Sequence, residues 1–163
     1  MLLNLSNHGP KMKLVYDFTK VLEEDTERVK LAQALTLDAS RPRMGLRGNH
    51  GLFGSEEWWE SIKNERIKTV THSGVIERTY FSGQDSRWGN QVNSFSLRLV
   101  DGSLIEQSIY AAKKNDHSLF VVGAMVLMIS ALDELKSQPA IDGGTNYSQV
   151  VLEVAISVEK LDR

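Results

Sequence analysis

Four glycines stand at every third position just before the only pair of adjacent tryptophans in the chain: Gly45, Gly48, Gly51 and Gly54. Glycines let a backbone approach an anion closely, and the N-terminus of a following helix would add positive potential. Three arginines lie in or just before the same segment: Arg41, Arg43 and Arg47. The composition therefore raises the possibility of a phosphate-binding loop.

The residues around the glycines argue against that chemistry. Neither of the two common phosphate motifs, G-x-G-x-x-G and G-x-x-x-x-G-K-[ST], is present. The helix expected after the glycines begins with Glu56 and Glu57, whose carboxylates would repel a phosphate at the amides meant to bind it. We therefore expect residues 41–54 to form an irregular strap, in which the glycines permit positive φ angles or close packing.

Catalytic and metal-binding patterns are not recognisable in the sequence. The four histidines are scattered singly: His8, His50, His72 and His117. Without cysteine, a tetrahedral zinc site would need ligands from distant segments. No G-x-S-x-G motif occurs, and Ser55 is better explained as the N-cap of the helix that follows it. We predict no catalytic residue, metal or cofactor, and keep His50 as a candidate contact residue beside Arg47.

A polar loop over residues 82–91 contains a compact mixed cluster of Asp85, Arg87 and Trp88. Tryptophan and arginine are enriched at the energetic centres of protein interfaces, so the loop has the composition of a contact site. The alternative is that Trp88 folds back as a lid over the barrel end. The acidic pair Asp133 and Glu134 is interpreted as solvated surface charge.

Length, composition and charge indicate a soluble, cytoplasmic protein of one domain. The chain has 163 residues, and its 19 Lys and Arg against 21 Asp and Glu give a net charge of −2. It therefore has no overall basic field to attract nucleic acid. No secretory signal or membrane segment is recognised. We expect a loosely ordered N-terminus over residues 1–11 and a single domain over 12–163.

The hydrophobic periodicity changes along the chain. Apolar residues at steps of three and four predict an amphipathic helix over 17–38, and a short helix over 56–64 carries Trp58 and Trp59. Adjacent helical positions diverge by about 100°, so one indole should be in the core and the other on a flank. Strands are predicted over 68–81, 94–99, 104–111 and 150–158. The apolar segment 124–136 suits a helix by propensity, but its extended flanks favour a strand.

These elements predict an α+β fold, mainly β. The order resembles a five-stranded antiparallel OB-type barrel over residues 55–163, preceded by the amphipathic helix and the strap. The alternative is a helix over 124–136, which would give an open sheet with helices.

The sequence therefore predicts a non-catalytic module that binds a protein partner, either of the immunity type or a regulatory accessory protein. The proposed contact residues are Trp88, Arg87, Asp85, Trp58, Trp59, Arg47 and His50. One alternative is an OB-type binder of single-stranded nucleic acid. Another is a small-molecule binder or enzyme with a site at the barrel mouth, around His50 and Asp85.

Overall fold

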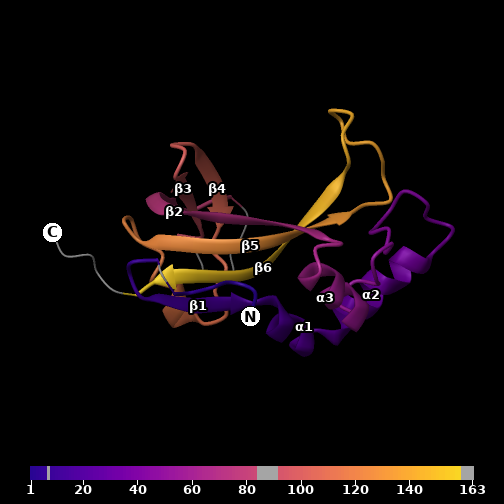
Figure 1. Cartoon of the computed structure of the whole chain (residues 1–163), viewed down its shortest axis with the longest axis horizontal. Helices are drawn as coiled ribbons and strands as arrows, with labels where there is room; N and C mark the ends of the chain where they lie inside the picture. The colour runs from indigo at the N-terminus through magenta and orange to yellow at the C-terminus, as the bar shows by residue number, and fades with distance from the viewer. Residues whose placement is uncertain (7, 84–91, 159–163) are drawn as a thin grey trace. The chain divides into compact units, whose positions relative to one another are not determined.

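The computed structural model describes residues 1–6, 8–83 and 92–158. Within these ranges the chain forms six strands and four helices, labelled in Figure 1. In chain order they are β1 (Met12–Asp17), α1 (Phe18–Glu24), α2 (Thr26–Leu37), α3 (Glu56–Lys63), β2 (Lys68–Tyr80), β3 (Ser94–Leu99), β4 (Leu104–Ser108), α4 (Lys114–His117), β5 (Met125–Glu134) and β6 (Tyr147–Ser157).

The strands form one sheet in the order β1-β6-β5-β2-β3-β4. The pairs β1–β6, β2–β3 and β3–β4 are antiparallel. The predicted α+β class, mainly β, is confirmed. The sheet is open, with β1 and β4 at its edges, so the expected barrel is not closed and the open-sheet alternative holds. Residues 124–136 nevertheless supply β5, so the choice of a strand for this segment is confirmed.

Strand β1 was missed in the sequence because turn-forming residues precede it and its pairing partner is distant. It pairs with β6 from Met12 opposite Ser157 to Asp17 opposite Glu153, with a shift in register between Leu14 and Tyr16. A six-residue strand whose stabilising contacts come from the far end of the chain leaves a weak local signal.

The chain folds into two compact units. The first comprises Met1–Asp17, Thr71–Ile129 and Glu153–Arg163, and the second comprises Phe18–Val70 and Ser130–Leu152. Strands β2, β5 and β6 contribute residues to both units. The expectation of a single domain over 12–163 stays a prediction.

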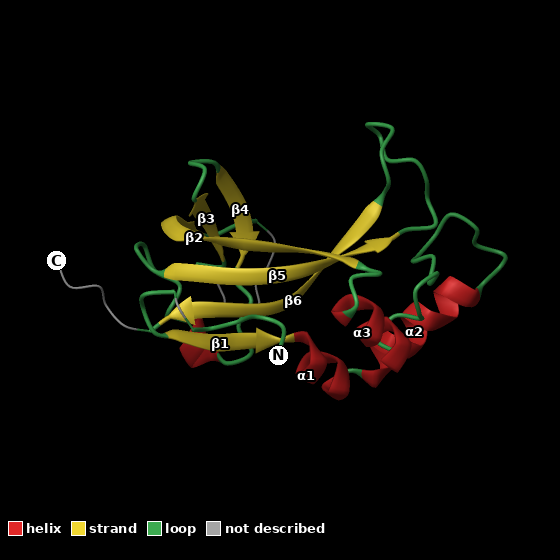
Figure 2. Ribbon diagram, in the orientation of Figure 1, coloured by secondary structure: helices red, strands yellow, loops and turns green. Residues whose placement is uncertain are grey.

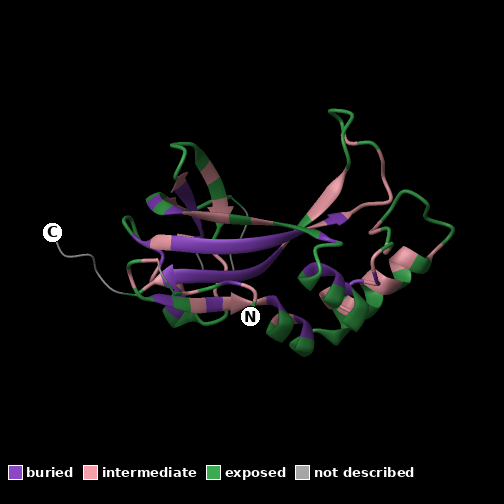
Figure 3. Cartoon of the chain, in the orientation of Figure 1, coloured by how far each residue is buried: buried purple, intermediate pink, exposed green. Residues whose placement is uncertain are grey.

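In the first unit, strand residues form the core. Phe95 and Leu97 of β3 are fully buried, and the Phe95 ring lies 5.6 Å from that of Phe120, measured between centroids. Figure 3 shows that β5 and β6 are buried along most of their lengths, as expected for inner strands of a sheet. At the start of the chain, the backbone N–H groups of Leu2 and Leu3 donate to the Glu153 carboxylate.

In the second unit, α1, α2 and α3 lie together (Figure 2), and aromatic rings connect α1 with α3. The ring centroid of Trp58 lies 5.1 Å from Phe53 and 4.9 Å from Trp59. Trp58 is fully buried and Trp59 is half-buried, which confirms the expected division of the two indoles. The Ser55 hydroxyl accepts a hydrogen bond from the backbone N–H of Trp58 at 3.2 Å, so the predicted capping role of Ser55 is also confirmed.

The predicted helix over 17–38 is divided in two. The helix is interrupted at Asp25, which is the N-cap of α2. Its side chain accepts a hydrogen bond from the backbone N–H of Arg28 at 3.2 Å. None of the residues of α2 is fully buried. The apolar stripe expected on one long helix is therefore only partly covered on α2, where Val29 and Leu35 pack against strap glycines.

Candidate functional site

The glycines of the strap have the conformation expected from the sequence. Their φ angles are positive: 89° at Gly45, 71° at Gly48, 110° at Gly51 and 75° at Gly54. A Cβ atom added at Gly51 would lie 2.6 Å from the backbone nitrogen of Trp58, and one at Gly48 would lie 2.7 Å from the Thr36 methyl group. The prediction of positive φ and close packing is therefore confirmed, since the strap lies directly on α2 and α3.

Backbone hydrogen bonds fix the strap to the end of β5. Leu46 forms an antiparallel bridge with Leu135. The Arg47 N–H donates to the Glu134 carbonyl at 2.9 Å, and the Lys136 N–H donates to the Gly45 carbonyl at 2.9 Å. The strap is consequently an ordered element of the second unit, which presents the side chains around it in defined positions.

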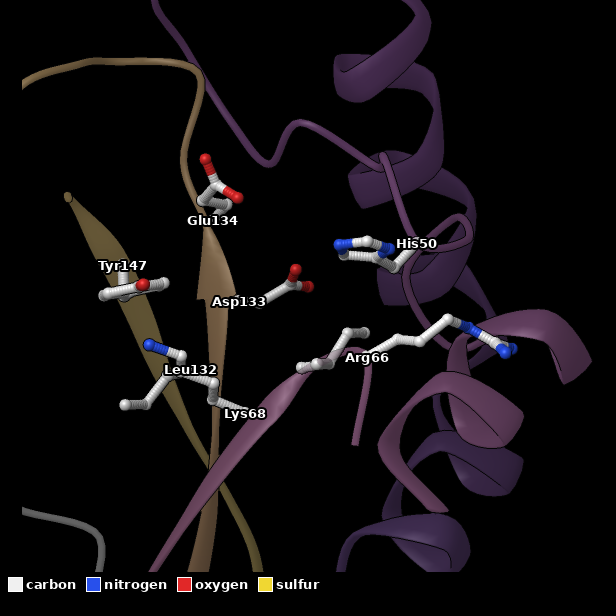
Figure 4. A pocket seen from close by; sticks show the side chains of 8 residues that line it. His50, Arg66, Lys68, Leu132, Asp133, Glu134 and Tyr147 are labelled. Atoms are coloured by element: carbon white, nitrogen blue, oxygen red, sulfur yellow. The ribbon is translucent and has the colours of Figure 1, made fainter. Parts of the chain in front are cut away.

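A cavity of about 200 Å³ lies between the strap and the ends of the strands in the second unit. It is lined by His50, Arg66, Ile67, Lys68, Leu132, Asp133, Glu134 and Tyr147. Figure 4 shows the His50 and Asp133 side chains pointing toward each other across it. Within the described ranges, no group of three or more histidine, aspartate or glutamate residues is arranged to hold a metal ion.

Asp133 is the most perturbed group of this cavity. Asp133 is 5% exposed, and its Oδ2 accepts a hydrogen bond from the Trp58 indole N–H at 2.9 Å. Burial raises the pKa of Asp133, and the neighbouring Glu134 charge acts in the same direction. The hydrogen bond from Trp58, a backbone hydrogen bond from Glu134 and the nearby His50 only partly oppose this rise in pKa. The interpretation of Asp133 as solvated charge was wrong.

Two other charged groups of the cavity, Glu134 and Arg66, have partners within the second unit. The Arg47 Nε lies 3.9 Å from Glu134 Oε1, and the Asn49 amide donates to Glu134 Oε2 at 3.3 Å. The Arg66 Nε donates to the Ser61 hydroxyl at 3.3 Å. Figure 4 accordingly shows the Arg66 guanidinium extending away from Asp133.

The structure separates the contact residues proposed from the sequence. His50 lines the cavity, and Arg47 lies at its edge in the pair with Glu134. Trp58 is fully buried, and its indole N–H donates to Asp133; its proposed contact role stays a prediction. Trp59 keeps a half-exposed side chain. A final group lies outside the described residues: Asp85, Arg87 and Trp88.

Asp133 was missed although the sequence contained a signal for it. It falls inside the apolar segment 124–136, which the sequence predicted as a strand. A carboxylate near the end of such a strand is expected to be at least partly desolvated. Its donor, Trp58, is 75 positions away in the chain, so the hydrogen bond itself was not predictable.

Comparison with known families places the chain among the immunity proteins, which are protein-binding modules. Residues 12–157 match the family described as immunity protein RhsI2, and the chain belongs to this family. The predicted immunity-type binding module is thereby confirmed at the level of the class, and its partner is a protein. No curated protein sequence matches the chain. None of the helices in the described ranges is long and apolar enough to cross a membrane.

Proposed function

We propose that the protein protects a cell by binding a protein toxin directly, and that the strap and the adjoining cavity form part of the contact surface. The observation that carries the proposal is the family match over residues 12–157. The size of the cavity supports a protein ligand, because about 200 Å³ is below the range of roughly 300–1,000 Å³ that small-molecule pockets occupy.

The outer side of the strap has suitable side chains for an interface. Arg41, Arg43 and Arg47 are exposed, and Met44 is 51% exposed among them. Arginine and methionine are both enriched at protein interfaces. Because backbone hydrogen bonds already hold the strap, little conformational entropy remains to be lost when a partner binds.

The loop residues Asp85, Arg87 and Trp88 are a second proposed contact, on the basis of their composition. If both surfaces bind, replacing Arg87 and Trp88 with alanine should weaken toxin capture and leave the melting temperature nearly unchanged. Unchanged capture together with a large loss of stability would exclude a contact role for these two residues.

The main test uses a candidate toxin, to be sought among the genes that neighbour the gene for this chain. Cells producing that toxin should survive when they also produce the full chain, and the two purified proteins should form a complex measurable by calorimetry. Replacing Arg43 and Met44 together with alanine should weaken the complex about tenfold or more, as loss of an interface anchor does. Val100→Ser is the matched control, because Val100 is exposed in the first unit. Neither protection nor binding by the unmodified chain would refute the proposal.

Three further hypotheses from the sequence remain predictions. Binding of single-stranded nucleic acid would be indicated by affinity for labelled oligonucleotides that falls steeply with salt. A small-molecule or enzymatic site around His50 and Asp85 would require these two residues in one pocket, and Asp85 lies outside the described residues. The cytoplasmic location is the third and would be checked by cell fractionation.

A further inference from the structure

The cavity beside the strap contains a buried carboxyl group, that of Asp133, whose charge is not needed for its hydrogen bond within the fold. Asp133 is 5% exposed, and its carboxylate accepts a hydrogen bond from the Trp58 indole. An asparagine at this position would accept the same hydrogen bond through its side-chain oxygen without bringing a charge. Burying a carboxylate without a paired cation costs free energy. The charge therefore indicates an interaction of Asp133 with another molecule.

Among the described residues no arginine or lysine pairs with this carboxylate, and His50, which faces it, opposes only part of the rise in its pKa. Asp133 forms none of the salt bridges found among the described residues. Arg47 is engaged with Glu134, and Arg66 is held by Ser61 with its guanidinium directed away from the cavity. Apart from His50, the described residues that line the cavity therefore provide no cation paired with this carboxylate.

We propose that this cavity receives a cationic side chain of the toxin, an arginine or a lysine, whose head group pairs with Asp133. The inference rests on the proposed function and names the chemistry of the partner at the same site. His50 forms the opposite wall, and Glu134 adds a second carboxylate at the edge. The cavity volume of about 200 Å³ suits the head group of one side chain better than a whole metabolite.

An anionic ligand is disfavoured by the same geometry. It would be drawn to Arg66 and Lys68, which also line the cavity. Because Arg66 is directed away toward Ser61, an anion in the cavity would instead lie against the carboxylates of Asp133 and Glu134. Repulsion between the anion and these two carboxylates opposes binding.

The first experiment titrates the full ¹⁵N-labelled chain with N-acetyl-arginine methylamide and follows the Trp58 indole N–H by NMR. The signal should shift in a saturable manner, because the Trp58 donor shares Asp133 with the incoming cation. The neutral citrulline analogue should cause no shift, and neither should the arginine probe added to Asp133→Asn. The Trp59 indole is the internal reference. A shift produced by inorganic phosphate instead of arginine, or no shift with arginine at tens of millimolar, would overturn the proposal.

The second experiment measures toxin affinity with two matched acid-to-amide variants. Asp133→Asn should weaken the complex at least tenfold, whereas Glu57→Gln, at an exposed position of α3, should bind like the unmodified chain. Replacing the anchoring basic residue of the toxin with glutamine should abolish the difference between the unmodified chain and Asp133→Asn. Equal toxin affinity of Asp133→Asn and the unmodified chain would overturn the cavity proposal and leave the proposed function standing. Failure of the unmodified chain to bind the toxin would refute the proposed function, while the arginine titration would still report on the cavity.

Discussion

The hydrogen bond from the Trp58 indole to Asp133 joins an aromatic core to a polar cavity. Trp58 lies against Phe53 and Trp59, so its ring is fixed on several sides and its N–H has one direction in which to donate. The carboxylate at the other end is desolvated by the same packing. A side chain that costs stability where a neutral isostere would fit is typical of a binding residue.

Replacing Asp133 with asparagine should therefore change the stability of the protein in a pH-dependent way. Burial raises the pKa of Asp133 in the folded chain, so the folded state holds this proton more tightly than the unfolded state. The contribution of Asp133 to the free energy of unfolding consequently falls as pH rises from the ordinary carboxyl pKa, about 3.9, through the raised value. Asp133→Asn should melt at a higher temperature than the unmodified chain at pH 7.

The difference in melting temperature between Asp133→Asn and the unmodified chain should shrink as the pH falls from the raised pKa of Asp133 to about 3.9, below which the carboxyl is neutral in both states. Thermal melts followed by circular dichroism at several pH values measure this. Glu57→Gln provides the control at an exposed carboxylate. A variant that is less stable than the unmodified chain at pH 7 would contradict this account of Asp133.

Gly51 offers a second prediction at the residue scale. Gly51→Ala should destabilise the protein in two ways. Gly51 has a φ of 110°, and an added Cβ would lie 2.6 Å from the backbone nitrogen of Trp58. Gly143 in the same unit has a φ of 86° but nothing within 4 Å of an added Cβ. Gly143→Ala should lose only the conformational term, about 1–2 kcal/mol. Gly51→Ala should lose about 1–3 kcal/mol more through overpacking, in urea unfolding curves. Equal losses would show that the strap adapts at no cost.

The sequence predicted residue properties that depend on near neighbours and missed those that depend on distant ones. The capping role of Ser55 and the division between Trp58 and Trp59 follow from helix geometry within a few positions. Positive φ at the glycines follows from residue type. The environment of Asp133 depends on Trp58 and on the packing of the strap, which no local pattern contains.

At the scale of elements, a single lysine connects α2, the strap and the residues after β5. The Lys136 Nζ donates to the Leu35 carbonyl at 2.6 Å and to the Arg41 carbonyl at 3.1 Å. Its backbone N–H also donates to Gly45. A cation at these carbonyls stabilises the C-terminus of α2, where the helix dipole is negative.

Lys136→Met should therefore destabilise the protein by about 1.5–3 kcal/mol, the usual value for hydrogen bonds to a charged group. The methylene stem is kept, so the change removes mainly the donor. Lys63→Met is the control, because within the described ranges Lys63 forms one long surface ion pair, with Glu60 at 3.9 Å. That substitution should change the free energy of unfolding by less than about 0.5 kcal/mol. Similar effects of the two substitutions would argue against the capping role of Lys136.

Elements with a regular pattern were predictable, and those defined by distant pairing were not. Period-two alternation located β3 and β6, and the strand predicted over 104–111 corresponds to β4, which pairs with β3. The pattern could not show that Asp25 divides the helix or that residues 12–17 pair with the far end of the chain. Closure of the sheet depends on its edges, and the missed strand β1 is one of them.

For the whole molecule, the family match extends over both compact units, whereas the candidate site lies in the second unit. The match covers residues 12–157 and so includes most of both compact units. The cavity and the strap belong to the second unit alone. The loop proposed from the sequence, with Asp85, Arg87 and Trp88, is in the sequence range of the first unit.

Hydrogen exchange of the toxin complex would separate these two surfaces. We expect binding to slow amide exchange in peptides covering residues 41–54 and 132–136, because the strap and the end of β5 share the hydrogen bonds around the cavity. In Asp133→Asn, at equal occupancy of the complex, the slowing should be reduced most at residues 132–136. The peptide over residues 104–108, in edge strand β4, serves as the control that should not change. Slowed exchange confined to peptides over residues 82–91 would instead assign toxin binding to the loop and remove the strap from the contact surface.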